Sequence, residues 1–378
     1  MTRKLLTLVL AVAVIVSMVV VGCAKPAPAP APTPAPAPAP SPAPAPAPTP
    51  PAEPIVLKWT THEPNTPGST QEWIRQFAAQ VEEKTEGRVK VEVFWGAVLG
   101  KVSDWVKIVG QPGVADAGFI VSTYHQWEIP MWAAAGLPGF STGYKIQGKA
   151  LWDLYNEWPA MQQEMEKVNV KPLAALHCHP HYMTLAQPMT TIDELKGKKM
   201  WIAGFWSPLT DYLGIVNVQM TAPELYEALQ KKLISGALGL PFHAQRIFKT
   251  YEQNKYFYSF AFSGGSPVNG EVINLDVWNS ISPKDQKTIE GICASLDDWY
   301  INEMDRETGE LNKFFEEQGV TIGELSPADQ DRWKVLCAEI IWPDWVATAN
   351  ERGIPADEFL ERYKAKCQEV AKGLGAAS

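Results

Sequence analysis

The sequence predicts an α/β fold with enough chain for two lobes or domains. From residue 55 onward, short apolar strands alternate with amphipathic helices, the order that builds parallel sheets with right-handed crossovers. About 320 of the 378 residues follow a Pro-rich N-terminal stretch, which is enough for two lobes. A late strand at residues 270–274 is expected to return to the first lobe.

The first 54 residues are expected to lie outside the folded body. Residues 1–22 join Arg3 and Lys4 to an apolar run, as a secretory signal does. Residues 20–23 resemble a bacterial lipobox, which implies cleavage before Cys23 and a lipid on its sulfur. An uncleaved transmembrane anchor is the alternative, and either way the body is extracytoplasmic and tethered to the membrane. Residues 23–54, nearly pure Ala-Pro, favour an extended spacer of up to roughly 90 Å.

The first half of the body shows clear strand and helix patterns. Strands are expected where apolar residues alternate or run together, at residues 55–61, 88–94, 115–121 and 171–177. Helices are expected around Trp73, Phe77 and Val81, and at residues 102–109 and 151–168.

The second half begins with a helical turn at residues 192–195 and a strand at 199–202. Thr221 is then expected to cap a helix, with Glu224 completing a capping box and Gly236 ending the helix. Helices are also expected at residues 244–251, at 283–317 after Ser282, and after the cap Ser326.

Two motifs in this half carry a resemblance to a known family. They are Glu194-Leu-Lys-Gly-Lys-Lys-Met-Trp-Ile202 and Glu224-Leu-Tyr-Glu-Ala-Leu-Gln230, the latter followed by Ile234-Ser-Gly236. The chain resembles the solute-binding subunits of TRAP transporters, the DctP family, from about residue 55 to 372. The resemblance implies a two-lobed periplasmic-binding-protein fold (type II-like) with a cleft between the lobes and a long lobe-spanning helix. Lobe I would hold residues 55–178 and 267–306, and lobe II residues 179–266 and 307–378.

The resemblance also implies where a ligand binds. Ligands of open α/β sheets bind beyond the carboxyl ends of the strands, where the family places polar or charged contacts. The residues expected to contact the ligand are His62, Tyr124, His181, Trp201, Phe205, Trp206, Gly239 and Phe242. For Tyr124, packing between the lobes is an equal alternative.

Trp201 stands where the family has the Arg that grips a ligand carboxylate. Arg holds a carboxylate with two parallel charge-assisted hydrogen bonds, whereas Trp offers one N–H donor and a wide ring face. We therefore expect an aromatic-lined cleft and a ligand that is not a simple C4-dicarboxylate. The alternative is that Trp201 is a core residue and that Arg246, Lys198 or Lys199 grips an ordinary acid.

His177, His179 and His181 alternate along a strand and could face a metal ion together. Pro180 disturbs that alternation, so a metal site is a weak candidate and no cofactor is expected. Four further cysteines, at positions 178, 293, 337 and 367, could pair or remain free thiols.

The sequence thus predicts an extracytoplasmic solute receptor rather than an enzyme. The net charge of −9, without basic clusters, argues against nucleic acid as a partner. The expected partners are a small organic solute and, by the resemblance, TRAP membrane permease subunits. A metal receptor and a secreted enzyme on the same fold are the competing classes, but no nucleophile–base pair, phosphate loop or dinucleotide motif occurs in the sequence.

Overall fold

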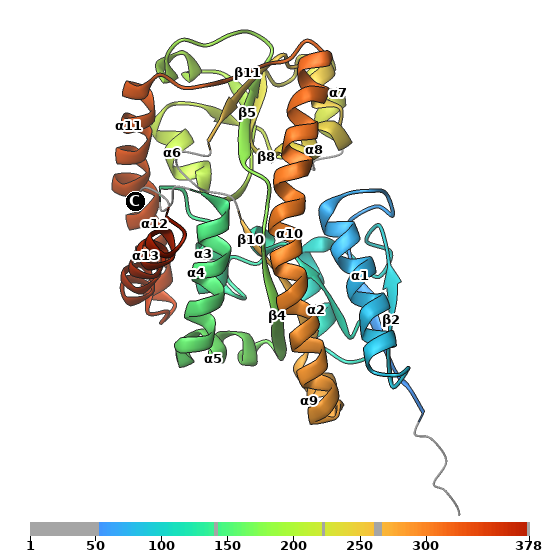
Figure 1. The fold of residues 1–378 in the computed structure, drawn as a ribbon. Coiled ribbons are helices and arrows are strands. Elements are labelled where there is room, and N and C mark those ends of the chain that lie inside the picture. The colour runs from blue at the N-terminus through green and yellow to red at the C-terminus, as the bar shows by residue number, and fades with distance from the viewer. Residues whose placement is uncertain (1–52, 140–142, 221–223, 261–266, 376–378) are drawn as a thin grey trace, which may run out of the picture. The chain divides into compact units, whose positions relative to one another are not determined.

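Two β-sheets organise the part of the chain that the computed structural model describes, residues 53–139, 143–220, 224–260 and 267–375 (Figure 1). The predicted secretory signal, the lipid site at Cys23 and nearly all of the spacer lie outside these residues. The prediction of a two-lobed α/β fold is confirmed, because each sheet is covered by its own helices. Among the described residues, no helix is both long and apolar enough to cross a membrane.

The first sheet has five strands. In spatial order they are β2 (Val89–Phe94), β1 (Ile55–Thr60), β3 (Ala117–Ile120), β10 (Val268–Asn274) and β4 (Val170–His177). β1 is parallel to both β2 and β3, whereas β10 runs antiparallel between β3 and β4. The late strand therefore does return to the first sheet, as predicted. Because β10 is antiparallel, its amino end lies at the edge where the parallel strands end.

Helices cover both faces of the first sheet. Those involved are α1 (Ser69–Lys84), α2 (Trp105–Gly110), α3 (Pro130–Ala134), α4 (Tyr144–Glu157), α5 (Pro159–Lys167) and α9 (Leu275–Ser280). On one face α1 and the long helix α10 (Pro283–Glu317) bury a cluster built around Trp59, Trp73 and Phe77. On the other face α2, α4 and α5 contact the strands. Each face thus has its own apolar core.

The second sheet has six strands. In spatial order they are β11 (Thr321–Glu324), β9 (Tyr256–Ser259), β5 (His181–Leu185), β8 (Gly236–Pro241), β6 (Lys199–Ile202) and β7 (Val216–Asn217). β5 runs antiparallel to both of its neighbours, and β6 is parallel to β8 and β7. The helices associated with it are α6 (Ser207–Tyr212), α7 (Leu225–Gln230), α8 (Phe242–Ile247), α11 (Pro327–Leu336) and α12 (Trp342–Glu351).

Helix α10 connects the two sheets. Its 35 residues extend about 52 Å at 1.5 Å per residue. The cap is the predicted one, since Ser282 Oγ accepts a hydrogen bond from the Asp285 N–H. Ile289 to Met304 pack on the first sheet, whereas Leu311 and Phe315 pack on the second. The expectation of a lobe-spanning helix is met.

Two predicted helices are shorter than the sequence suggested. The helix expected at residues 151–168 is divided into α4 and α5 at Trp158, whose backbone is extended (φ −116°, ψ 111°). Pro159 follows it, and the residue before a proline is sterically driven out of the helical region. The helix expected up to Gly236 ends at Gln230, and Lys232 takes a left-handed conformation.

Gly236 begins strand β8 rather than ending the helix. A Cβ atom there would lie 2.4 Å from the Thr184 carbonyl oxygen, so glycine is required by close contact between strands. The cap predicted at Thr221 lies outside the described residues. Thr191 and Glu194 instead form a capping box on the turn at residues 192–195.

The C-terminal helices do not all belong with the second sheet, where residues 307–378 were expected. Helix α13 (Ala356–Gly373) packs against α4, and the Tyr363 hydroxyl donates to the carbonyls of Ala135 and Gln147. Helix α11 does lie with the second sheet, because Arg332 of α11 forms an ion pair at 2.9 Å with Asp193. A buried stripe on α13 centred on Phe359 and Tyr363 accounts for its place beside the first sheet.

Candidate functional site

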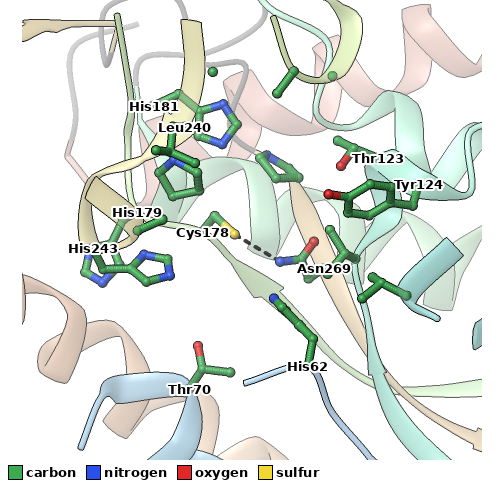
Figure 2. A pocket seen from close by; sticks show the side chains of 18 of the residues that line it. His62, Thr70, Thr123, Tyr124, Cys178, His179, His181, Leu240, His243 and Asn269 are labelled. Carbon is green, nitrogen blue, oxygen red and sulfur yellow. Dashed lines mark hydrogen bonds between the residues drawn. The ribbon is translucent and has the colours of Figure 1, made fainter. Parts of the chain in front are cut away.

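A cavity of about 160 Å³ lies where the strand ends of the two sheets face each other (Figure 2). It is lined by residues that follow β1 and β3, by the first residues of β10 and β5, and by the ends of β6 and β8. The first turn of α1, helix α8 and Tyr300 of α10 complete the wall. Segments far apart in the sequence therefore meet at one site.

His62 and Glu63 supply part of the wall on the side of the first sheet. The His62 ring stacks on Phe119, with ring centroids 5.6 Å apart and an interplanar angle of 16°, and also contacts Trp105. The Glu63 side chain is buried and accepts a hydrogen bond of 2.7 Å from Gln71 Nε2. The Gly96 N–H donates to the Glu63 carbonyl and the Ala97 N–H to the Thr61 carbonyl, which holds this loop in place. Both side chains are thus fixed before any ligand arrives.

Asn269 and Tyr300 fix the remainder of this side. Asn269 Oδ1 accepts from the Ser122 N–H, and its Nδ2 donates to Cys178 Sγ at 2.9 Å, the dashed line in Figure 2. The Tyr300 hydroxyl donates to the His177 carbonyl at 3.1 Å and lies 3.2 Å from Thr70 Oγ1. Helix α10 is therefore linked to the segment in which the chain crosses from β4 to β5.

Trp201, on β6, contributes a ring to the opposite side. Its N–H is already used, since it donates to the Met220 carbonyl at 3.0 Å, and the side chain is buried. Gly239 lies beside it with φ 91°, and a Cβ there would be 3.1 Å from the Ala203 carbonyl oxygen. The Trp201 indole therefore offers the cavity its ring surface and not a hydrogen-bond donor.

Four imidazoles line the same space, those of His62, His179, His181 and His243 (Figure 2). Burial lowers the pKa of His62 to about 4 and the pKa values of His181 and His243 to about 3. These three rings are neutral at pH 7, when each has one donor and one acceptor nitrogen. His181 is only 4% exposed, and neither of its ring nitrogens has a hydrogen-bond partner within the described part of the chain. A ligand could satisfy them.

A second, more polar compartment adjoins the cavity and shares Thr70, His179 and His243 with it. Glu307 of α10 occupies it and accepts from the Ser69 N–H and from His179 Nε2, each at 3.2 Å. Burial acts to raise the pKa of Glu307, but the hydrogen bond from His179 and the charge of that ring outweigh it and lower the pKa. The Arg246 guanidinium lies 4.0 Å from the same carboxylate. Glu307 is thus an anion with several partners.

The structure brings together five of the eight residues expected to contact a ligand. His62, Tyr124, His181, Trp201 and Gly239 line the cavity. Their contact with a ligand stays a prediction.

The other three lie outside the cavity wall, in apolar packing. Trp206 contacts Trp333 and Phe260, Phe242 stacks on Tyr182, and Phe205 packs within the first core cluster. The sequence indicated their proximity to strand ends but not the face on which they lie.

The three histidines do not form a metal cluster. His179 pairs with Glu307, His177 is buried with its ring 5.6 Å from that of Tyr300, and His181 lines the cavity. Within the described part of the chain, no group of three or more His, Cys, Asp or Glu side chains could hold a metal ion. Cys178, Cys293, Cys337 and Cys367 are free thiols.

The sequence missed several residues of the wall. Asn269 lies at the start of an antiparallel strand, and Tyr300 lies in the middle of a helix. A rule based on the carboxyl ends of parallel strands predicts neither position. Glu63 directly follows His62 and could have been noted as a polar residue at a strand end. Among the described residues that line the cavity, none is Arg or Lys.

Comparison with known proteins gives one family. A sequence profile described as DctP, bacterial extracellular solute-binding protein, family 7, matches residues 61–342. The outer membrane transporter protein TsaT of Comamonas testosteroni is 23% identical over 304 residues, which cover 78% of this chain and 86% of that protein. A monocarboxylate 2-oxoacid-binding periplasmic protein of a Nostoc species is 26% identical over 246 residues, covering 62% and 64%.

Solved structures share the fold. A TRAP solute-binding protein from a marine metagenome, specific for aromatic acid ligands and bound to metahydroxyphenylacetate, superposes with a TM-score of 0.74. It is 21% identical, and the match covers 84% of this chain and 99% of that one. At this identity the likeness concerns the fold alone.

Proposed function

The chain belongs to family 7 of the bacterial extracellular solute-binding proteins, the DctP family, and we propose that it is the receptor of a TRAP-type transporter for a compact, ring-bearing solute. No bond is made or broken in this role. The receptor captures the solute outside the cytoplasm and delivers it to membrane permease subunits. Residues 1–54 would export the protein and tether it through a lipid on Cys23, with the Ala-Pro stretch as a spacer.

The observation that carries the proposal is a cavity with ring-bearing walls and, among its described residues, no Arg or Lys. Phe119, Trp201 and Phe248 supply apolar surface. An apolar cavity of about 150 Å³ takes up benzene, so a volume of about 160 Å³ suits a single ring with a small substituent. A relative of the same fold binds an aromatic acid, which supports a ring as the core of the solute.

Closure of the two lobes would couple binding to recognition by the permease. The first sheet contributes His62 and Asn269 to the wall, and the second contributes Trp201 and His181. A solute that contacts both sheets stabilises the closed state by the contacts that it makes only there. His179 lies in the segment that crosses between the sheets, which makes that segment a natural hinge.

One observation favours a second candidate, a receptor for an ordinary carboxylate. Arg246 lines the adjoining compartment and could reach an acid group of a solute that spans both spaces. However, Glu307 lies 4.0 Å from this guanidinium and would repel a second anion. Lys198 and Lys199 do not line the cavity. The ring-bearing solute is therefore the better-supported candidate.

A thermal-shift screen of the purified protein tests the proposal. The compounds should include neutral aromatics, aromatic acids, aromatic amines, C4-dicarboxylates and divalent metal ions. A ligand at a hundred times its Kd stabilises the folded state by about 2.7 kcal/mol, which gives a clear rise in Tm. We expect ring compounds to raise the Tm and dicarboxylates to leave it unchanged. A strong shift with dicarboxylates alone would contradict the proposal, and a shift with metal ions alone would revive a metal receptor.

A further inference from the structure

We propose that the solute carries a basic nitrogen next to its ring and that Glu63 is the residue that anchors this nitrogen. The inference rests on the proposed function, because it assumes that the cavity receives a ring. Beyond the proposed function, the inference states the charge of the solute. We expect this charge to be positive, whereas many members of the family bind acids.

Glu63 lies in the cavity wall, and among the described residues its carboxyl group has no fully charged hydrogen-bond or ion-pair partner. Its side chain is 5% exposed and is held by the Gln71 amide at 2.7 Å. His62 Nε2 lies 3.5 Å from Glu63 Oε1, on a ring whose pKa is lowered to about 4 by burial. Both neighbours are therefore neutral at pH 7. A buried carboxylate without a cation is costly, and a cationic ligand would offset that cost.

The surroundings of Glu63 add negative charge rather than positive charge. Burial raises the pKa of Glu63, and the charge of the nearby Glu307 raises it further, to about 7. Glu307 already has the Ser69 N–H, His179 and Arg246 as partners. Among the described residues, Cys178, Glu271 and Tyr300 also interact electrostatically with Glu63, and none of these three carries a positive charge. An anionic solute would meet repulsion here, and a cationic one attraction.

The rings of the wall suit a cation as well. The face of a Trp, Tyr or Phe ring attracts a cation within about 6 Å, and Trp201, Phe119 and Tyr124 all line the cavity. The indole N–H of Trp201 points to the Met220 carbonyl, so this edge does not compete for the solute. A carboxylate and several aromatic rings therefore line one cavity, where the carboxylate can pair with an amine by charge and the rings by cation–π attraction.

Three probes of nearly equal size distinguish the charges: benzylamine, benzyl alcohol and benzoate. Their Kd values should be measured by calorimetry at pH 8, where Glu63 is largely ionised and the amine is protonated. Hydrogen bonds to charged groups contribute about 1.5–3 kcal/mol. We therefore expect benzylamine to bind about ten- to a hundredfold more tightly than benzyl alcohol, and benzoate to bind most weakly.

The variant Glu63→Gln should reduce the amine-to-alcohol preference to near one. Glu83→Gln, an exposed Glu on α1, is the matched control and should keep the preference. Glu63→Asp keeps the charge and should retain part of it, which guards against a general effect of substitution in the loop. Because the buried carboxyl is replaced by a neutral group of similar shape, Glu63→Gln should also remain folded.

The wild-type comparison is decisive even without variants. If benzyl alcohol or benzoate binds as tightly as benzylamine, Glu63 is not a cation anchor, although the receptor for a ring-bearing solute survives. If the parent protein prefers benzylamine but Glu63→Gln keeps this preference, Glu63 is again not the residue that binds the nitrogen. If none of the three binds, the inference is overturned, and the wider thermal-shift screen then decides the proposed function.

Discussion

The two walls of the cavity differ in chemistry. On the side of the first sheet, Glu63, Asn269 and Tyr300 present polar atoms that hydrogen bonds already hold in position. On the side of the second sheet, Trp201 and Leu240 present apolar surface, interrupted by the imidazoles of His181 and His243. Polar atoms recognise a functional group, whereas apolar surface recognises a shape and excludes water. The solute would therefore be recognised mainly through its functional groups on one side and mainly through its shape on the other. Only closure of the two lobes would bring both walls into contact with it.

Removal of the Trp201 ring should have the largest effect. Trp201→Ala would leave a cavity among Leu225, Leu229 and Leu240 and should cost about 3–5 kcal/mol in the free energy of unfolding. Urea unfolding measures this cost, and the thermal shift by a ring compound should disappear in the folded fraction. Trp127→Ala, at a residue that is 38% exposed, is the control. Equal losses in both variants would show that Trp201 is not a packed part of the wall.

The polar wall can be weakened without creating a cavity. Tyr300→Phe removes the hydroxyl that donates to the His177 carbonyl, and the loss of a buried hydrogen bond should cost about 1–3 kcal/mol. Tyr226→Phe, which removes an exposed hydroxyl bonded to Glu252, should cost much less. The comparison of the two urea midpoints gives the result. If Tyr300→Phe is as mild as the control, helix α10 does not depend on this link to the crossing segment.

The two walls should also respond to pH in opposite directions. His181 has a pKa of about 3 in the folded state, below its ordinary 6.5, so its stabilising contribution is complete above pH 6.5 and is lost as the pH falls toward 3. Glu63 has a pKa of about 7, above its ordinary 4.5, so its contribution is complete below pH 4.5 and is lost as the pH rises toward 7.

Substitutions separate these two contributions. His181→Gln should flatten the rise of stability between pH 4 and 6.5, by up to about 1.4 kcal/mol per pH unit. Glu63→Gln should flatten the fall between pH 4.5 and 7. Urea unfolding of both variants and the parent protein across pH 4–8 provides the curves. Unchanged slopes would mean that neither group titrates differently in the folded and unfolded states.

Gly239 tests how tightly the apolar wall is packed. Gly239→Ala adds a Cβ at φ 91°, 3.1 Å from the Ala203 carbonyl oxygen, and should cost about 1–2 kcal/mol. Gly319→Ala has a similar φ of 74° but open space around the new atom, so it isolates the backbone strain. The difference between the two melting temperatures is the cost of crowding. Equal melting temperatures would show that the atoms around Gly239 can shift to accommodate the added Cβ at little cost.

Arg246 should matter least. Its guanidinium is 41% exposed and 4.0 Å from Glu307, and such ion pairs contribute at most about 1 kcal/mol. Arg246→Gln should therefore change the melting temperature little and leave the binding of a ring-bearing amine essentially intact. If the variant instead abolishes binding of an acid that the parent protein binds, Arg246 is the residue that binds the carboxylate. The contrast drawn above between the two walls would then be wrong.

Local patterns were sufficient to predict most of the fold from the sequence. The cap at Ser282 and the existence of a strand at residues 270–274 follow from short-range signals, and both are present, whereas the pairing of that strand with the first sheet is a long-range contact. The division at Trp158 was also accessible, because the effect of Pro159 on the preceding residue is local. The position of α13 was not accessible, since a buried stripe on a helix does not say which of two sheets it covers.

The site was only partly predictable, and the reason is geometric. Trp201 was identified because it stands at the motif position where the family has Arg. Phe242 and Trp206 seemed equally suitable, yet they face the cores, because residue type alone does not fix the side of a short helix on which a ring lies. Asn269 enters from an antiparallel strand, whose direction depends on long-range pairing that the sequence does not display.

The most direct test of the central claim is a calorimetric comparison of benzyl alcohol with succinate on the wild-type protein. The account predicts measurable binding of the ring compound, none of succinate, and no competition when both are present. Binding of succinate that displaces the ring compound would contradict it, because the cavity would then grip carboxylates without an arginine in its described wall.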